Sequence, residues 1–179
     1  FRSAGARGKV EAKLVGPLAA EATCTLKMRV PESLTPDHKA RSKRLVSLQI
    51  TTTARLLPGE RRVEFHTVVN NNAKDHRVRA LFQSGVAKAD TVSAESAFDV
   101  VTRAIDLPPW EEIKDWGQKP IPMKHQDRFV SVSDGKRGLT LINRGLPEYE
   151  ARRDRGGVSL LVTLFRVFSH LAMDDHFER

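Results

Sequence analysis

The sequence predicts an all-β fold, a large antiparallel β-sandwich with little helix. About ten short runs alternate apolar with polar residues, as expected of strands that bury one face. Turn-forming residues separate these runs, and apolar stripes at helical spacing are rare. Such strands pack as paired antiparallel sheets. Residues 1–8 are small, basic and glycine-bearing and are expected to be disordered, whereas residues 9–179 are expected to form a single β-sandwich domain.

Five strands are expected in the first half of the chain. They span residues 9–15, 23–30, 44–57, 62–69 and 76–82. The third and fourth form a hairpin, because a proline-glycine turn at 58–60 joins them directly. The polar residues 31–43 are expected to form a loop and the asparagines at 70–72 a turn. In the fifth strand the apolar side chains are expected to face inward, with Arg77 and Arg79 outward.

The second half begins with a weaker strand signal and a connector. Residues 91–105 are expected to form an edge strand or two short strands. The proline-rich residues 107–122 are expected to contain scant regular structure. Residues 158–171 fit both a helical stripe and a strand. Their β-branched residues and the glycine pair that precedes them favour a buried strand through about Phe168.

A second hairpin is expected between the connector and that last strand. Its strands lie at 129–132 and 138–142, joined by a turn signal at 133–135. Residues 143–145 then favour another turn, since asparagine and glycine adopt positive φ at low cost. A third strand is expected from Glu148 onward. The order is therefore strand, turn, strand, turn, strand.

Composition excludes several classes of function. The net charge is +8, from 30 Lys and Arg against 22 Asp and Glu, but the densest basic groups at 39–44 and 152–155 adjoin turn residues and read as solvated loops. Aromatic residues are few and no nucleic-acid-binding signature is present, so no nucleic-acid partner is expected. No apolar stretch approaches the roughly 20 residues of a membrane span. The single cysteine, Cys24, forms no intramolecular disulfide, which favours a cytoplasmic protein.

The sequence predicts neither a metal site nor a catalytic residue within this chain. Three Asp-His dipeptides occur, but neighbouring strand residues point to opposite faces and no pattern supplies convergent zinc ligands. Glu148 and Glu150 share a strand face and lie about 6.5–7 Å apart, a separation that inverting glycosidases use. Any alternating strand with an acidic pair gives this spacing, so a solvated face is the favoured interpretation.

One stretch of the chain carries an ordered set of short motifs. Residues 129–135 read FVSVSDG, residues 138–142 are GL with an apolar strand, and residues 143–150 read NRGLPEYE. In this order and spacing the motifs resemble the C-terminal β-domain of the α-mannosidases of glycoside hydrolase family 38. The resemblance touches about two thirds of the chain, roughly from Val46 onward. It is supported upstream by the runs at 62–65, 70–82 and 97–103.

The resemblance implies the large two-sheet sandwich similar to galactose mutarotase. In that family the zinc, the nucleophilic aspartate and the acid/base carboxylate belong to an N-terminal α/β region, to which nothing in this sequence corresponds. The chain is therefore expected to be an excised C-terminal part of a retaining, zinc-dependent α-mannosidase, inactive by itself and without a cofactor of its own. Its expected partners are the N-terminal catalytic domain of the same chain and, through the full-length enzyme, a mannoside substrate.

Two polar turns, at 70–77 and 143–149, are the candidates for a carbohydrate or domain-interface site, because loops carry function more often than strands. An arginine there could donate paired hydrogen bonds to sugar hydroxyls or to a carboxylate of a partner domain. The alternative is that these residues satisfy turn backbone and that Glu148 pairs with a neighbouring arginine. The candidates are Asp75, His76, Arg77, Asn143, Arg144, Glu148 and Tyr149.

A different class of function is also compatible with the sequence, namely a non-catalytic carbohydrate-binding or structural module. Sugar sites favour exposed aromatic rings, and Trp110, Trp116 and Tyr149 are the only Trp and Tyr residues. Tryptophan in a proline-rich connector is more often an anchor packed against the sandwich. The mannosidase-domain interpretation is therefore favoured.

Overall fold

The structure is a computed structural model that describes residues 3, 6–113 and 119–168. It is built of antiparallel strands, and its described residues contain a single helix, the four-residue α1 (Trp110–Ile113). The all-β class predicted from the sequence is confirmed. No helix within the described residues is long and apolar enough to cross a membrane. The expectation of disorder for residues 1–8 falls in part on residues 1, 2, 4 and 5, which lie outside the described ones, and β1 already begins at Gly8.

The chain divides into two compact units. Unit 1 comprises residues 1–76 and 167–179, and unit 2 comprises residues 77–166. The single domain predicted for residues 9–179 stays a prediction.

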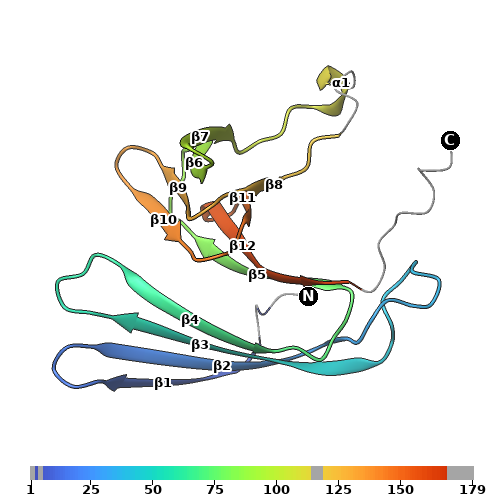
Figure 1. Cartoon of the computed structure of the whole chain (residues 1–179), viewed down its shortest axis with the longest axis horizontal. Coiled ribbons are helices and arrows are strands. Elements are labelled where there is room, and N and C mark those ends of the chain that lie inside the picture. Colours follow the sequence, from blue (N-terminus) through green and yellow to red (C-terminus); the bar gives the residue numbers. More distant parts are fainter. Residues whose placement is uncertain (1–2, 4–5, 114–118, 169–179) are drawn as a thin grey trace. The chain divides into compact units, whose positions relative to one another are not determined.

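Unit 1 contains one sheet of four antiparallel strands, each paired with the next along the chain (Figure 1). The predicted hairpin around residues 58–60 is confirmed, because β3 and β4 pair from Leu56↔Val63 to Gln49↔Asn70. The predicted loop at 31–43 is also found and contains the isolated bridge Leu34↔Arg41. The strands are β1 (Gly8–Leu14), β2 (Ala20–Pro31), β3 (Leu45–Leu56) and β4 (Val63–Asn70).

The sheet of unit 1 has one polar and one apolar face, as two-residue alternation requires. On the polar face, hydroxyl groups pair across β2 and β3, with Thr23 Oγ1 3.0 Å from Thr53 Oγ1. One residue further along, the register places Cys24 opposite both Val10 and Thr52 on the apolar face. Cys24 is half-buried there, in the alternating run where the sequence places it.

Unit 2 is a sandwich of two four-stranded antiparallel sheets. One sheet has the order β10-β9-β6-β7 and the other the order β5-β12-β11-β8 (Figure 1). The strands of the first are β6 (Thr91–Ser96), β7 (Asp99–Ala104), β9 (Phe129–Ser133) and β10 (Gly138–Ile142). Those of the second are β5 (His76–Gln83), which starts at the last residue of the first segment of unit 1, β8 (Met123–His125), β11 (Glu148–Asp154) and β12 (Gly157–Val167).

The core of unit 2 lies between its two sheets. Alternate residues of β6, β9 and β10 face alternate residues of β11 and β12, and Val130 and Leu160 are both 0% exposed. Leu139 and Leu141 of β10 pack against this cluster. The buried cluster consists of Val86, Ala89, Val92, Ala94, Ile105, Val130, Val132, Tyr149, Ala151, Val158 and Leu160.

The tight β11–β12 connection fixes the register of this sheet. Gly157 has φ of 103°, and a Cβ at this position would lie 2.2 Å from the backbone oxygen of Val86. The backbone approaches this closely because Val158 N donates a 2.9 Å hydrogen bond to Val86 O. Glycine at 157 is therefore required both by its conformation and by space.

The strand predictions for unit 2 hold with two exceptions. Residues 91–105 form the two strands β6 and β7, of which β7 is the edge, and the last run forms strand β12 rather than a helix. The sequence did not predict α1, nor the three-residue strand β8. Arg77 and Arg79 lie on the outward face of β5, as predicted, because they pair with Glu148 and Glu150 on the face opposite the core. Their side chains are nevertheless only 26% and 25% exposed.

Candidate functional site

Glu148 lies at the centre of a cluster of charged side chains on the β5-β12-β11 part of unit 2. It begins β11, so its side chain points to the face opposite the core residue Tyr149. Its Oε1 accepts a 3.0 Å hydrogen bond from Arg77 Nη1 and a 2.5 Å hydrogen bond from Thr163 Oγ1. Its Oε2 accepts a hydrogen bond from Arg166 Nη2. Glu148 therefore accepts hydrogen bonds from three side chains, one on β5 and two on β12.

This environment sets the protonation state of Glu148. Burial by itself would raise the pKa of this carboxyl group, but the hydrogen bond from Thr163 and the positive charges of Arg166 and Arg77 outweigh it. The pKa therefore lies below its ordinary value, and Glu148 is ionised at neutral pH. A general acid in glycoside hydrolysis needs the opposite shift.

Glu150 forms a second ion pair on the same face, with Arg79. Glu150 is only 8% exposed, so the solvated acidic face that the sequence favours is wrong. The reason is that β5 adjoins β12 in this sheet, which brings both of its arginines within reach of the two carboxylates of β11. The alternation of charged and apolar residues along β5 indicated that one face of this strand is charged. It did not indicate that this face contacts the carboxylates of β11.

The turn after β10 is held by its own side chain. Asn143 Oδ1 accepts a 2.8 Å hydrogen bond from Leu146 N, and Asn143 Nδ2 donates a 3.2 Å hydrogen bond to Arg128 O. Gly145 takes the positive φ of 76° that the turn needs. The neighbouring Arg144 is exposed, and its guanidinium has no hydrogen-bond or ion-pair partner within residues 3, 6–113 and 119–168.

Asp75 and His76 belong to a corner of unit 1. Leu34 N donates a 3.2 Å hydrogen bond to Asp75 Oδ2, and Arg41 donates to the backbone oxygen of Asp75. Asp75 has a positive φ of 54°. His76 Nδ1 donates a 3.2 Å hydrogen bond to Lys74 O. These contacts tie the turn before β5 to the loop after β2, which is the backbone-satisfying role of the alternative interpretation.

The Tyr149 side chain lies in the core of unit 2, with 1% exposure. Arg103 Nη1 donates hydrogen bonds to Tyr149 OH at 3.4 Å and to His125 O at 3.0 Å. The ring therefore contributes packing and does not reach a surface where a sugar could stack. Trp110 is half-buried in α1, and Trp116 lies outside the described residues.

The structure brings together only part of the predicted set. Arg77 and Glu148 form an ion pair, and Asn143 and Arg144 share one turn. The sequence did not identify Thr163 and Arg166, which also donate hydrogen bonds to Glu148. Their proximity to Glu148 follows only from the β11–β12 register, in which Tyr149 is opposite Val162. Within the described residues, no group of three or more His, Cys, Asp and Glu residues could hold a metal ion.

Comparisons of the chain with a family model, with curated proteins and with solved structures agree on one family. The model of the family described as the glycosyl hydrolases family 38 C-terminal domain matches residues 4–176. A curated protein of Halalkalibacterium halodurans, described as "Putative mannosylglycerate hydrolase", is 36% identical over 138 residues, which are 76% of this chain and 14% of that protein. This chain therefore spans about one seventh of the length of that relative.

Two solved structures are similar to the chain as well. One is a glycosyl hydrolase family 38 protein from Enterococcus faecalis, with 27% identity and a TM-score of 0.74. The other is an α-mannosidase from Enterococcus faecalis, with 29% identity and a TM-score of 0.78. Each alignment covers 91% of this chain and 19% of the solved chain.

Proposed function

The chain belongs to the family of glycosyl hydrolase family 38 C-terminal domains, and we propose that it is the C-terminal β-domain of a longer enzyme that hydrolyses α-mannosides. The observation that carries this proposal is the family match, which extends over nearly the whole chain. The similarity to an α-mannosidase structure over 91% of the chain supports the same activity for the longer enzyme.

Within that enzyme the domain is a structural support that contributes no reacting group. The carboxylates most suited to glycoside chemistry, Glu148 and Glu150, are each paired with arginine and hold strands of unit 2 together. The zinc ion, the nucleophile and the acid/base carboxylate of a retaining mechanism are assigned to an N-terminal catalytic domain of the same polypeptide.

Two substrates are proposed for the longer enzyme. An α-mannoside follows from the similar α-mannosidase, and mannosylglycerate follows from the description of the Halalkalibacterium halodurans relative. Both place the enzyme in mannose metabolism. The cytoplasm remains the expected compartment, because the single cysteine leaves no intramolecular disulfide.

An activity assay tests this proposal. The chain by itself and the longer enzyme would be incubated with an aryl α-mannoside and with mannosylglycerate, with and without added zinc. We expect turnover by the longer enzyme only. Zinc-dependent turnover by the chain alone would contradict the assignment of the catalytic groups to another domain.

Arg144 is our candidate for contact with sugar or with a carboxylate of the catalytic domain, because its guanidinium is exposed and is not used by the fold of unit 2. Replacing it in the longer enzyme, Arg144→Ala, should raise KM or weaken domain association without lowering the stability of unit 2. Arg77→Ala is the matched comparison, since Arg77 is bound to Glu148 and its loss should lower stability instead. If Arg144→Ala leaves KM and association unchanged, this residue is only part of the turn.

A further inference from the structure

One end of the apolar face of the β1–β4 sheet carries an ordered set of side chains that are apolar except for Thr52 and Thr67, whose hydroxyl oxygens lie 3.1 Å apart. Strand pairing aligns these residues in three rows that run across the four strands. We call them the apolar end of unit 1. The rows are Leu14-Ala20-Leu56-Val63, Ala12-Ala22-Ala54-Phe65 and Val10-Cys24-Thr52-Thr67.

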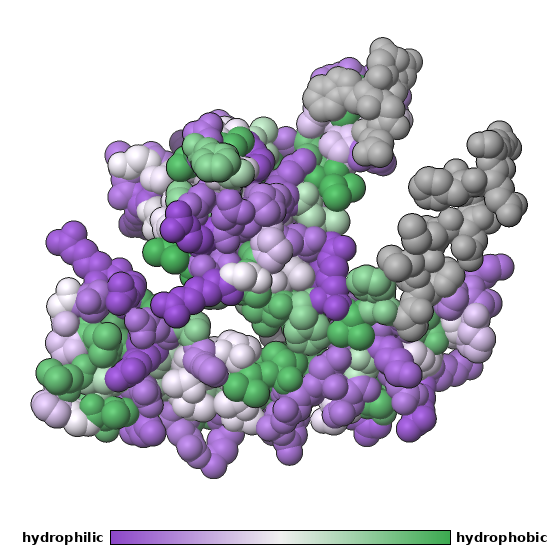
Figure 2. Space-filling model, in the orientation of Figure 1, coloured by the Kyte–Doolittle hydropathy of each residue, from purple (hydrophilic) through white to green (hydrophobic). Residues whose placement is uncertain are grey.

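Large side chains of the apolar end are exposed. Leu14 is 82% exposed, Val10 65%, Leu56 49% and Val63 48%. Figure 2 shows hydrophobic side chains reaching the surface at the end of the sheet where the β1–β2 and β3–β4 turns lie. Contiguous exposed apolar surface of this kind marks interaction sites in proteins.

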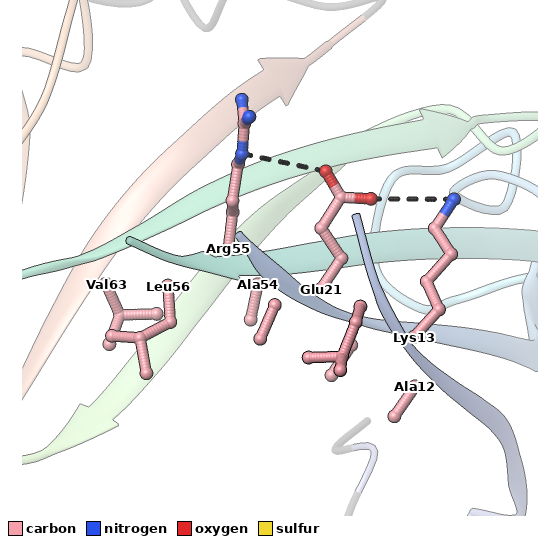
Figure 3. A pocket seen from close by; sticks show the side chains of 10 residues that line it. Ala12, Lys13, Glu21, Ala54, Arg55, Leu56 and Val63 are labelled. Atoms are coloured by element: carbon pink, nitrogen blue, oxygen red, sulfur yellow. Dashed lines mark ion pairs between the residues drawn. The ribbon is translucent and has the colours of Figure 1, made fainter. Parts of the chain in front are cut away.

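The opposite face of the same strands is polar, and its charged side chains pair with one another. Glu21 Oε2 lies 3.6 Å from Lys13 Nζ and Glu21 Oε1 lies 3.7 Å from Arg55 Nε. Figure 3 shows these three side chains on one side of the sheet, while Ala54, Leu56 and Val63 extend to the other. The sheet therefore has one polar face suited to contact with solvent and one apolar face suited to packing against a partner.

The apolar end also has a shape that a partner can fill. The middle row places Ala12, Ala22 and Ala54 side by side, and the first row adds the larger Leu14 and Leu56 beside them. The result is a shallow hollow of about 530 Å³ with a floor of alanine side chains. A ridge of side chains from another layer would fit such a hollow. Within the described residues of unit 1 no second sheet and no helix provides that layer.

We infer that the apolar end of unit 1 is the surface on which the preceding part of the mannosidase polypeptide docks. The inference rests on the proposed function, because it takes its occupant from the longer enzyme. In the similar solved enzymes the matched region is 19% of the chain, so most of such an enzyme is available to supply the covering layer. Because the two parts are covalently linked, their effective concentration is high and even a shallow surface is occupied. A second copy of the domain lacks this advantage.

The test compares two valines of the same strand. Val63 and Val68 both lie on β4 and are 48% and 50% exposed, but Val63 belongs to the apolar end, whereas Val68 lies opposite Thr51 on the polar face. The variants Val63→Cys and Val68→Cys would be made in the longer enzyme and in the chain by itself. The rate of thiol alkylation at each site would be read by peptide mass spectrometry, in a Cys24→Ser background.

In the chain by itself both introduced cysteines should react at similar rates. In the longer enzyme we expect alkylation at position 63 to slow by at least about tenfold, with position 68 unchanged. Equal rates at position 63 in both proteins would overturn the inference. Slowing at position 63 in the chain alone, increasing with its concentration, would assign the surface to a second copy and overturn it as well.

The α-mannosidase activity of the unmodified longer enzyme is measured in parallel. An inactive enzyme with a protected position 63 contradicts the proposed function but not the docking surface. An active enzyme with an accessible position 63 contradicts the docking surface only.

Discussion

The strands of unit 2 and of unit 1 share the same alternation of apolar and polar residues, but the two units bury their apolar faces to different extents. In unit 2 two sheets enclose the apolar residues, so that Val130 and Leu160 are 0% exposed. In unit 1 one sheet presents Val10 and Leu14 at 65% and 82% exposure. Alternation therefore tells which face is apolar but not what covers it. That difference makes unit 2 the expected source of stability and unit 1 the expected source of contacts with other parts of an enzyme.

The largest expected effect is the removal of a core side chain in unit 2. Leu160→Ala should lower the free energy of unfolding by about 2–5 kcal/mol, because it leaves a cavity between the two sheets. Leu14→Ala in unit 1 is the matched change and should cost less than about 0.5 kcal/mol. Urea unfolding of the isolated chain, followed by tryptophan fluorescence and circular dichroism, measures both. Equal losses would remove the distinction between the units.

The next effect concerns the tight connection within unit 2. Gly157→Ala should cost roughly 2–4 kcal/mol, because alanine is strained at φ of 103° and its Cβ would overlap Val86 O. Gly145→Ala is the control, since φ is 76° there but nothing lies within 4 Å of the added Cβ, and it should cost about 1–2 kcal/mol. The same unfolding measurement applies. A harmless Gly157→Ala would show that this register is not fixed by the glycine.

A smaller effect is expected from the ion pairs of the two units. Arg79→Ala should cost about 1–3 kcal/mol, since it leaves the carboxylate of Glu150, only 8% exposed, without its arginine. Arg55→Ala in unit 1 breaks a 3.7 Å contact of a half-exposed side chain and should cost less than about 0.5 kcal/mol. A double-mutant cycle with Glu150→Gln isolates the pair in unit 2. A coupling energy near zero would show that the pair contributes only packing.

The smallest effect is a dependence on pH. The pKa of Glu148 is lower in the folded chain than its ordinary value of 4.5, so the ionised form favours folding. This stabilisation is fully present above the unfolded pKa and is lost as pH falls through the folded pKa. Unfolding free energies from pH 7 to pH 3 should therefore fall in the acid range, and Glu148→Gln should flatten that fall. An identical acid profile for the variant would show that other carboxylates cause it.

The sequence was informative where a single strand carries its own signal. The long alternating runs at 44–57 and 62–69 and the β-branched run before Phe168 predicted β3, β4 and β12 correctly. Strand β8 has only three residues, too few to display a period of two, and the sequence did not predict it.

The candidate site could be predicted only in part, because its contacts depend on which strands become neighbours. Glu148 was identified as a candidate and a neighbouring arginine was considered for it, but Thr163 and Arg166 follow only from the β11–β12 register. Arg79 reaches Glu150 because β5 joins β12, a pairing between segments far apart in the chain. Pairing between strands far apart in the chain cannot be predicted from the local pattern of a single sequence.

The central claim is that unit 2 is stable through its own core, whereas the sheet of unit 1 is completed by the rest of a longer enzyme. Hydrogen exchange measured by mass spectrometry on the isolated chain and on the longer enzyme tests it most directly. We expect similar protection of β9, β11 and β12 in both proteins, and exchange from β1 to β4 that is at least about tenfold slower in the longer enzyme. Equal exchange from β1 to β4 in the two proteins would contradict it.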